Sequence, residues 1–154
     1  MQVQKNLLEK RRSEFEDFYK GLIPALVEFV GRLGVKPAHE VLNQAVQFAP
    51  HMSTGLRDLQ VNDEQDRIWL LTRVAYFVGE YFAQKHGGCW YVNDIAGSRY
   101  FGRYVVGRFP SFQKQTLMLD PFEVAQTYVD TPPPRQLADV LAEVDAELQK
   151  ADLQ

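Results

Sequence analysis

The stretch Ile68–Phe109, IWLLTRVAYFVGEYFAQKHGGCWYVNDIAGSRYFGRYVVGRF, decides the fold because it joins an apolar helix pattern, two adjacent glycines and two aromatic-rich segments. The helix pattern forms two neighbouring apolar stripes, Ile68, Leu71, Ala75, Val78, Phe82 and Leu70, Val74, Phe77, Tyr81, widened by Trp69 and Tyr76. Asn62-Asp63-Glu64-Gln65 precedes it as a capping box, and Gly87-Gly88 ends it. We predict a central buried helix over residues 63–86 that packs on more than one side.

Gly79 lies inside this helix pattern. Within a helix, glycine costs about 0.8–1 kcal/mol relative to alanine. We therefore expect another backbone or a large ring to press against this turn of the helix.

The two segments after the double glycine are predicted to form a β-hairpin. Cys89–Val92 is the first strand, residues 93–98 are a loop and Arg99–Phe109 is a longer second strand, because aromatic and β-branched residues favour strands. In the second strand Arg99 and Arg103 alternate with aromatic residues, and neither face is purely apolar. The pattern leaves open whether the hairpin aromatics belong to the core or to the surface.

The N-terminal part of the chain, residues 1–48, is predicted to be helical. Residues 3–20 have helical spacing, and Pro24 either begins a second helix that runs to Leu33 or kinks a single helix. Pro37 then opens a short helix, Ala38–Phe48.

Residues 49–62 are predicted to be a loop, since they contain the turn formers Pro50, Ser53, Thr54 and Gly55. A loop of this length makes His51 and Met52 candidate rim residues of a pocket. An ordinary surface connection is the favoured interpretation.

The C-terminal part, residues 120–150, is predicted to hold two helices. Residues 116–119 are a possible third strand, and Asp120-Pro121-Phe122-Glu123 then starts a helix, with aspartate as the N-cap and proline in the first turn. Pro132-Pro133-Pro134 separates this helix from the last one. With the central helix and hairpin at 63–119, the chain is predicted to be a single α+β domain, 1–154, with helices packed around a small antiparallel sheet of two or three strands.

The composition excludes several classes of protein. The chain has 154 residues, of which 45% are hydrophobic and 24% charged, and its formal net charge of −3 disfavours binding to nucleic acid or to anionic lipid. No apolar run reaches about 18 residues and the N-terminus lacks the layout of a signal peptide, so no membrane association is predicted. A single cysteine requires no oxidising compartment, and a cytoplasmic location is predicted by elimination.

The sequence contains no recognisable catalytic or metal-binding constellation. Only His86-Gly-Gly-Cys89 places a histidine close to the cysteine, and a structural zinc site needs four ligands. The same pair lacks a third group that would orient it for nucleophilic catalysis, and Cys89 is interpreted as a small buried hydrophobe. We predict no metal and no cofactor.

Glu80 is the polar residue of most interest in the central helix. Its neighbours are aromatic, so we expect its carboxylate to be shielded and to need a cationic or hydrogen-bonding partner. Arg99, Arg103 or Arg108 could supply one, and an ion pair that fastens helix to sheet is favoured over a catalytic or ligand-binding carboxylate. Arginine among aromatic residues is also the composition enriched at interaction hot spots.

Three short motifs occur in the order Val78-Gly79-Glu80-Tyr81, Gly87-Gly88-x-Trp90 and Asp120-Pro121-Phe122. Over roughly its second half the sequence resembles small uncharacterised bacterial α+β proteins with the order G-E-Y, G-x-W and D-P-F. The resemblance implies the α+β fold, and some such proteins look like accessory or immunity-type proteins, which neutralise toxins. It supplies no catalytic residues.

These observations favour a non-enzymatic module that binds a protein partner, and the oligomeric state stays open. The candidate binding residues are Glu80, Trp90, Arg99, Tyr100, Arg103 and Tyr104. The alternative is a small-ligand or enzymatic pocket between the hairpin and the central helix that uses Glu80, Arg103, Tyr104 and His86. A deep cavity beside a shielded Glu80 would favour the pocket, whereas exposed Trp90, Tyr100 or Phe101 over a filled core would favour the interface.

Overall fold

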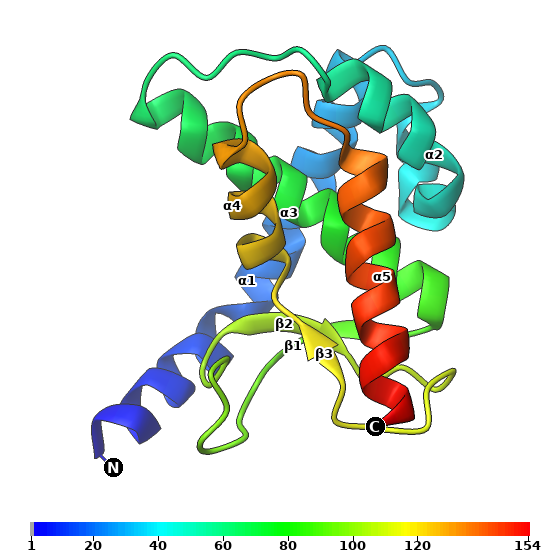
Figure 1. Cartoon of the computed structure of the whole chain (residues 1–154). Coiled ribbons are helices and arrows are strands. Elements are labelled where there is room, and N and C mark those ends of the chain that lie inside the picture. Colours follow the sequence, from blue (N-terminus) through cyan, green and yellow to red (C-terminus); the bar gives the residue numbers. More distant parts are fainter. Residues whose placement is uncertain (1) are drawn as a thin grey trace.

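The computed structural model describes residues 2–154, and its elements surround one central helix, α3 (Figure 1). In chain order they are α1 (Gln2–Arg32), η1 (Ala38–Glu40), α2 (Val41–Leu56), α3 (Glu64–His86), β1 (Cys89–Val92), β2 (Tyr104–Gly107), β3 (Met118–Leu119), α4 (Pro121–Asp130) and α5 (Leu137–Leu153). Helices α1, α2 and α4 and strands β1 and β2 pack against α3. The predicted α+β class and the central helix are confirmed.

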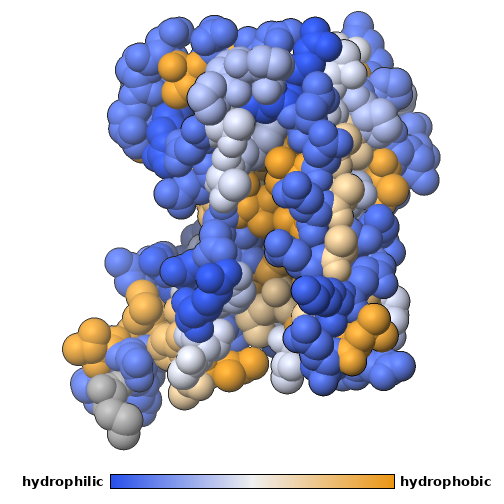
Figure 2. All heavy atoms as spheres, viewed as in Figure 1, coloured by the Kyte–Doolittle hydropathy of each residue, from blue (hydrophilic) through white to orange (hydrophobic). Residues whose placement is uncertain are grey.

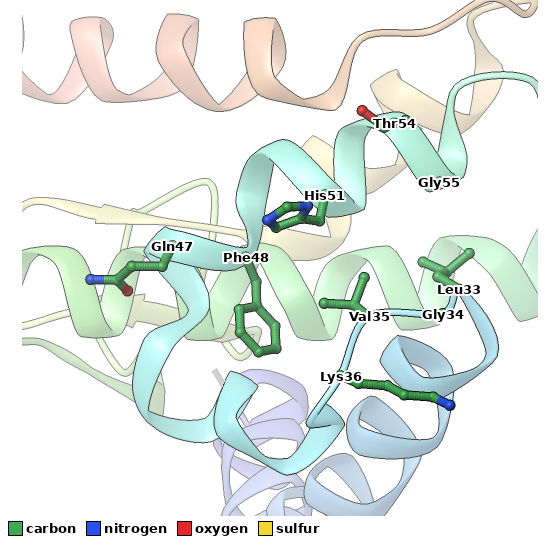
Figure 3. A pocket seen from close by; sticks show the side chains of 9 residues that line it. All are labelled: Leu33, Gly34, Val35, Lys36, Gln47, Phe48, His51, Thr54 and Gly55. Carbon is green, nitrogen blue, oxygen red and sulfur yellow. The ribbon is translucent and has the colours of Figure 1, made fainter.

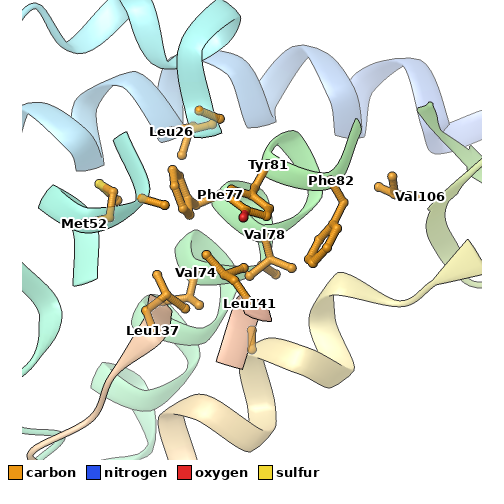
Figure 4. Close-up of a cluster of buried hydrophobic side chains, with 14 of the residues drawn as sticks. Leu26, Met52, Val74, Phe77, Val78, Tyr81, Phe82, Val106, Leu137 and Leu141 are labelled. Atoms are coloured by element: carbon orange, nitrogen blue, oxygen red, sulfur yellow. The ribbon is translucent and has the colours of Figure 1, made fainter. Parts of the chain in front are cut away.

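The hydrophobic core lies around α3 and receives side chains from every α-helix and every strand of the described chain. Phe77, Val78 and Phe82 of α3 are fully buried. Figure 4 shows Leu26 of α1 and Leu141 of α5 on different sides of these residues. A shared core of this kind is the organisation of a single domain.

The first turns of α3 extend beyond the core, which corrects the predicted apolar stripes. Ile68 is 55% exposed and Trp69 is 37% exposed. The guanidinium groups of Arg73 and Arg32 lie 4.4 and 5.8 Å from the centre of the Trp69 ring. Helical spacing predicts which residues share a face, but the length of the neighbouring helices decides how much of that face is covered.

Helix α1 runs through Pro24 as a single helix, which decides between the two predicted arrangements. Its C-terminal half is buried through Leu22, Leu26, Phe29 and Val30. Its N-terminal end extends away from the body of the molecule (Figure 1). Although α1 has 31 residues, no helix within residues 2–154 is both long and apolar enough to cross a membrane.

The predicted loop over 49–62 is wrong in its first half, because α2 continues to Leu56. Met52 and Leu56 are fully buried, so Met52 is a core residue rather than part of a pocket rim. Burial of this helix face outweighs the poor helix propensity of the turn-forming residues between them. Sequence propensity describes only the local preference, and here tertiary packing overrides it.

Helix α2 is broken near its start, and a side chain of α3 holds the break. Gln44 has non-helical angles, φ −133° and ψ 37°. The Gln84 Oε1 atom accepts a hydrogen bond from the Ala45 backbone N at 2.7 Å, and its Nε2 donates to the Val41 carbonyl at 2.9 Å. One amide side chain therefore satisfies both backbone groups that the break releases.

Two aspartates begin the helices that flank the sheet. Asp63, rather than the predicted Asn62, is the N-cap of α3, and its side chain accepts a hydrogen bond from the Asp66 backbone N at 2.8 Å. The predicted N-cap of α4, Asp120, is confirmed, because its carboxylate accepts hydrogen bonds from backbone N–H groups of the first turn, the nearer at 2.9 Å. The start of α4 is thereby fixed directly after β3.

The sheet is antiparallel, in the order β1-β2-β3, and in Figure 1 it lies in the lower half of the molecule, between the N-terminal end of α1 and the C-terminal end of α5. Its register pairs Trp90 with Val106. The second strand is shorter than the predicted Arg99–Phe109, since only Tyr104–Gly107 is strand. The preceding turn is fixed by a 2.8 Å hydrogen bond from the Gly102 N to the Asn93 carbonyl, and a φ of +75° at Gly102 takes the chain out of strand geometry.

Candidate functional site

Glu80 is buried in the central helix, with 6% of its surface exposed. Its Oε2 accepts a hydrogen bond from Trp90 Nε1 at 3.2 Å and a longer one from the Tyr19 hydroxyl at 3.5 Å. The expected shielding is therefore confirmed. The favoured ion pair with a hairpin arginine is wrong, because within residues 2–154 the groups that hydrogen-bond to Glu80 are a neutral indole and a neutral phenol.

The hairpin arginines are engaged elsewhere. Arg99 pairs with Glu123 at 2.6 Å, and Arg103 pairs with Asp120 at 2.9 Å. Arg108 lies 3.9 Å from the centre of an aromatic ring in β1. The N-cap and first turn of α4 place Asp120 and Glu123 next to the hairpin. Arg99 and Arg103 stay exposed in these pairs, whereas a pair at buried Glu80 would require a guanidinium to be buried as well.

A cavity of about 290 Å³ opens beside Glu80, between α1, α3 and the start of β1. Its lining consists of Phe15, Tyr19, Glu80, Ala83, Gln84, Gly88, Cys89 and Trp90. We call it the Glu80 cavity. Cys89 is exposed, which corrects its interpretation as a buried hydrophobe.

One carboxylate oxygen of Glu80 has no hydrogen-bond partner within the described residues, and Glu80 lines this cavity. Oε2 receives the hydrogen bonds from Trp90 and Tyr19, whereas Oε1 has no hydrogen-bond partner within the described residues. Every fully buried side-chain nitrogen or oxygen of residues 2–154 has a partner, so Oε1 is not fully enclosed by protein and reaches the cavity surface. The arrangement leaves one strong acceptor available to a molecule in the cavity.

The titratable groups of the Glu80 cavity are all acids. Burial raises the pKa of Glu80, and the hydrogen bonds from Trp90 and Tyr19 oppose that rise by stabilising the carboxylate. Burial, and then the charge of Glu80, raise the pKa of Tyr19, which keeps its hydroxyl protonated at neutral pH. Cys89 is the third titratable residue of the lining, which contains no lysine, arginine or histidine.

Gly79 and Phe18 hold the Trp90 ring in place. A Cβ atom at Gly79 would lie 1.9 Å from Cζ2 of Trp90, which confirms the expected large ring against this turn. The Phe18 ring meets the indole edge-on, with ring centres 5.4 Å apart. The indole is therefore fixed on both sides, and its N–H is directed to Glu80.

Tyr104 belongs to an aromatic cluster beside the cavity. Its ring stacks on Phe18 with centres 4.1 Å apart, and Phe18 also contacts Tyr76, Trp90 and Phe122. Of the four residues predicted for a pocket, only Glu80 lines the Glu80 cavity, since Tyr104 is in this cluster and Arg103 and His86 bind other acids. Sequence reasoning missed Tyr19 as a site residue, because 61 positions separate it from Glu80.

His86 takes part in a second cluster, which the sequence did not reveal. Its Nε2 lies 2.5 Å from Oδ1 of Asp145 on α5, and the Ser111 hydroxyl lies 3.4 Å from its Nδ1. The residue types are those of a hydrolytic triad, but the serine contact is long and none of the cavities described here is lined by this histidine or serine. The contact between His86 and Asp145 instead links the C-terminal end of α3 to α5.

Arg99 and Tyr100 lie at the rim of a groove between α4 and α5. The groove has a volume of about 220 Å³, and its apolar lining includes Leu119, Val124 and Leu148. Figure 2 shows hydrophobic residues in a hollow between these two helices. Trp90, by contrast, is buried, with 6% of its surface exposed. Five of the six predicted binding residues are thus divided between the Glu80 cavity, the aromatic cluster and this groove, and the sixth, Arg103, pairs with Asp120.

A further cavity, of about 590 Å³, lies where the turn after α1 meets α2 (Figure 3). Phe48 of α2 and Val35 of the turn lie on two sides of it. His51 is exposed at this cavity, as predicted for a rim residue. His51 and Lys36 are its only titratable residues, and neither is buried.

In the part of the chain that the structure describes, no group of three or more histidine, cysteine, aspartate or glutamate residues is placed to hold a metal ion. Comparisons of the chain with protein-family models, with curated proteins and with solved structures find no match. The geometry of the Glu80 cavity therefore carries the functional argument.

Proposed function

We propose that this protein binds a small organic molecule in the Glu80 cavity. The observation that supports this function is the unequal use of the two Glu80 oxygens. Oε2 accepts from Trp90 and Tyr19, while Oε1 reaches the cavity surface without a protein partner in residues 2–154. A ligand donor that binds Oε1 would complete the coordination of this carboxylate.

A buried carboxylate with one oxygen left without a hydrogen-bond partner is costly in free energy unless a ligand binds that oxygen. Removing a carboxyl group from water costs free energy that hydrogen bonds to protein must offset, and a purely structural glutamate is expected to pair both oxygens. Phe15, Tyr19 and Trp90 supply apolar walls around the remaining acceptor. Apolar walls with a few directed polar groups are the usual composition of small-molecule sites, and about 290 Å³ suits a short-chain compound.

The test uses Trp90 as the reporter. The chain has two tryptophans, Trp69 and Trp90, so a Trp69→Phe variant leaves only the indole that lines the cavity. We expect its fluorescence to change saturably on titration with at least one member of a panel of short-chain amines, alcohols, amides and carboxylates. Glu80→Gln in the same background should weaken that binding, and Glu143→Gln, an exposed change on α5, should not.

Two results would overturn the small-ligand function. One is the absence of a saturable response to every compound of the panel. The other is equal affinity of the Glu80→Gln and Glu80-containing chains for each compound that binds. Circular dichroism spectra of both variants would confirm that they are folded before titration.

We propose protein binding as a second function. The binding surface would comprise the groove between α4 and α5 and the hairpin loop of residues 93–98. The supporting observation is that the loop is exposed and yet ordered: buried Asn93 donates to Ser98 Oγ at 3.1 Å and accepts from the Ile95 N at 3.2 Å. A pre-ordered loop loses less conformational entropy on binding. Ile95 is 42% exposed, and Arg99 and Tyr100 continue this surface to the groove.

Co-purification from the native host tests the second function. The resemblance to immunity-type proteins makes a toxin domain the expected partner. We expect the chain with unchanged sequence to retain a partner that the double variant Arg99→Ala, Tyr100→Ala loses, while Glu143→Ala retains it. Retention of the same partner by the double variant would contradict binding at this surface.

A further inference from the structure

The Glu80 cavity has the chemistry of a site for a positively charged ligand. We infer that it binds a small organic ammonium ion, with the charged nitrogen against Glu80 Oε1 and its carbon substituents against Phe15, Tyr19 and Trp90. This inference rests on the small-ligand function proposed above and adds the ligand class.

The first support is the sign of the charges that line the cavity. Glu80, Tyr19 and Cys89 can each lose a proton and become negative, and the lining holds no basic side chain. The ionisable side chains of the lining therefore contribute a neutral or negative charge and never a positive one. A carboxylate or phosphate ligand would meet an unpaired acid there, whereas an ammonium ion meets an available acceptor.

Two arginines line an adjoining hollow that shares Phe15 and Trp90 with the Glu80 cavity, and both have other partners. Arg12 lines that hollow, and its Nη2 lies 2.8 Å from Asp94 Oδ2. Arg108 lines it as well, and its guanidinium lies 3.9 Å from the centre of the Tyr91 ring. Glu80 thus keeps an oxygen without a cationic partner within the described residues.

The second support is the aromatic lining. The Phe15 and Tyr19 rings are almost parallel, at 4°, with centres 6.3 Å apart, and the Trp90 indole forms another wall. Aromatic faces attract cations through their negative quadrupole, and the attraction is stronger where water is excluded. These rings combined with an accessible oxygen of the Glu80 carboxylate provide both interactions that an alkylammonium ion can make.

The third support is the state of the carboxyl group that this ligand requires. Trp90 Nε1 and the Tyr19 hydroxyl donate to Oε2, which stabilises the carboxylate form of Glu80. A bound cation adds to this stabilisation, so binding favours loss of the Glu80 proton. Affinity should therefore rise with pH as Glu80 ionises, and Tyr19 from α1 and Cys89 from β1 are the titratable groups that face it.

The experiment compares ligands of matched shape and different charge. The Trp69→Phe chain is titrated with n-butylammonium, n-butanol and butyrate, and with tetramethylammonium against neopentyl alcohol, at constant ionic strength set with sodium chloride. We expect each ammonium ion to bind at least about tenfold more tightly than its neutral match. We expect butyrate to bind more weakly than n-butanol.

Glu80→Gln separates charge from shape, because glutamine keeps a carbonyl oxygen for Trp90 and Tyr19. This variant should lose about tenfold or more in affinity for the ammonium ions and little for the alcohols. A second measurement is the pH dependence of ligand affinity in the chain that retains Glu80. It stays informative even if the Glu80→Gln variant does not fold. There the affinity for n-butylammonium should increase between acidic and neutral pH, and that for n-butanol should not.

The outcomes distinguish this inference from the function on which it rests. Tighter binding of an alcohol or of butyrate than of the ammonium ions would overturn the cation assignment and leave the small-ligand function standing. An affinity for n-butylammonium that does not change with pH would also overturn it. If none of these probes or the wider panel binds, both fail.

Discussion

Trp90 occupies the space that a side chain on Gly79 would need, since a Cβ atom there would lie 1.9 Å from Cζ2 of the indole. This contact brings β1 against α3 and directs the indole N–H to Glu80, 3.2 Å away. The glycine that is unfavourable for the helix is thus the residue that admits the ring beside the candidate site.

Gly79→Ala should therefore destabilise the protein, although alanine favours a helix. Displacing the ring from a packed position is expected to cost about 1–3 kcal/mol, which exceeds the gain in helix propensity of about 1 kcal/mol. Gly21→Ala is the matched control, because Gly21 lies in α1 and, apart from its chain neighbours and the local helix backbone, no atom lies within 4 Å of its Cβ position. Urea unfolding should show a loss for the first and a small gain for the second, and equal gains would contradict the packing argument.

Gln84 should stabilise the break in α2 through its two backbone hydrogen bonds. Gln84→Ala leaves the Ala45 N and the Val41 carbonyl without their side-chain partner, and we expect a loss of about 1–3 kcal/mol in urea unfolding. Gln84→Glu keeps an acceptor for Ala45 and loses the donor to Val41, so its loss should be smaller than that of alanine. Amide hydrogen exchange at Ala45 should accelerate in the alanine variant, and unchanged protection there would contradict this role.

Asp145 should make stability depend on acid pH. Burial raises the pKa of Asp145, but the hydrogen bond from His86 and the charge of Lys85 outweigh burial and hold it below its ordinary value. A depressed carboxyl pKa contributes stability above the unfolded pKa, about 3.9, and this contribution disappears as pH falls through the folded value. Asp145→Asn should therefore cost about 1–3 kcal/mol at pH 7.

The difference between the Asp145-containing chain and Asp145→Asn should shrink as pH falls from about 4, near the unfolded pKa, through the lower folded pKa of Asp145, below which both side chains are neutral. Glu143→Gln on the same helix provides the control, since Glu143 is exposed. Thermal unfolding at several pH values checks this. A difference that stays constant down to the lowest pH would show that charge on Asp145 contributes nothing.

Asp120 has two roles that two substitutions separate. Asp120→Asn keeps an oxygen for the N-cap of α4 and removes the charge that pairs with Arg103, whereas Asp120→Ala removes both. The N-cap is expected to contribute about 0.5–2 kcal/mol, so the alanine variant should be less stable than the asparagine variant by that amount. Denaturant midpoints measure the difference, and equal midpoints would rule out the capping contribution.

The candidate site could be predicted only in part from the sequence. The aromatic neighbours of Glu80 correctly predicted a shielded carboxylate, and the cost of glycine correctly predicted a large ring against Gly79. The partner of Glu80 was wrongly expected to be arginine, because Glu123 and Asp120 at the start of α4 attract Arg99 and Arg103 at positions where the guanidinium groups stay exposed. Spacing along the chain does not show which of several acids an arginine will reach.

Local chemistry determined where some of the elements begin and end. Asp120 before a proline was sufficient to locate the start of α4, because an N-cap depends only on residues within one turn. The α+β class and the extent of α3 likewise followed from periodicity and from the double glycine after His86.

Only the tertiary structure decided which residues meet. Tyr19 reaches Glu80 across 61 positions, and Asp145 reaches His86 across 59, so neither contact has a local sequence signal. The same holds for α2, which stays helical to Leu56 because its buried face packs against the rest of the core. The local conformational preference of a residue is set by its neighbours in the chain. The free energies of burial and of pairing depend instead on its neighbours in space. The Glu80 cavity forms through contacts of this second kind.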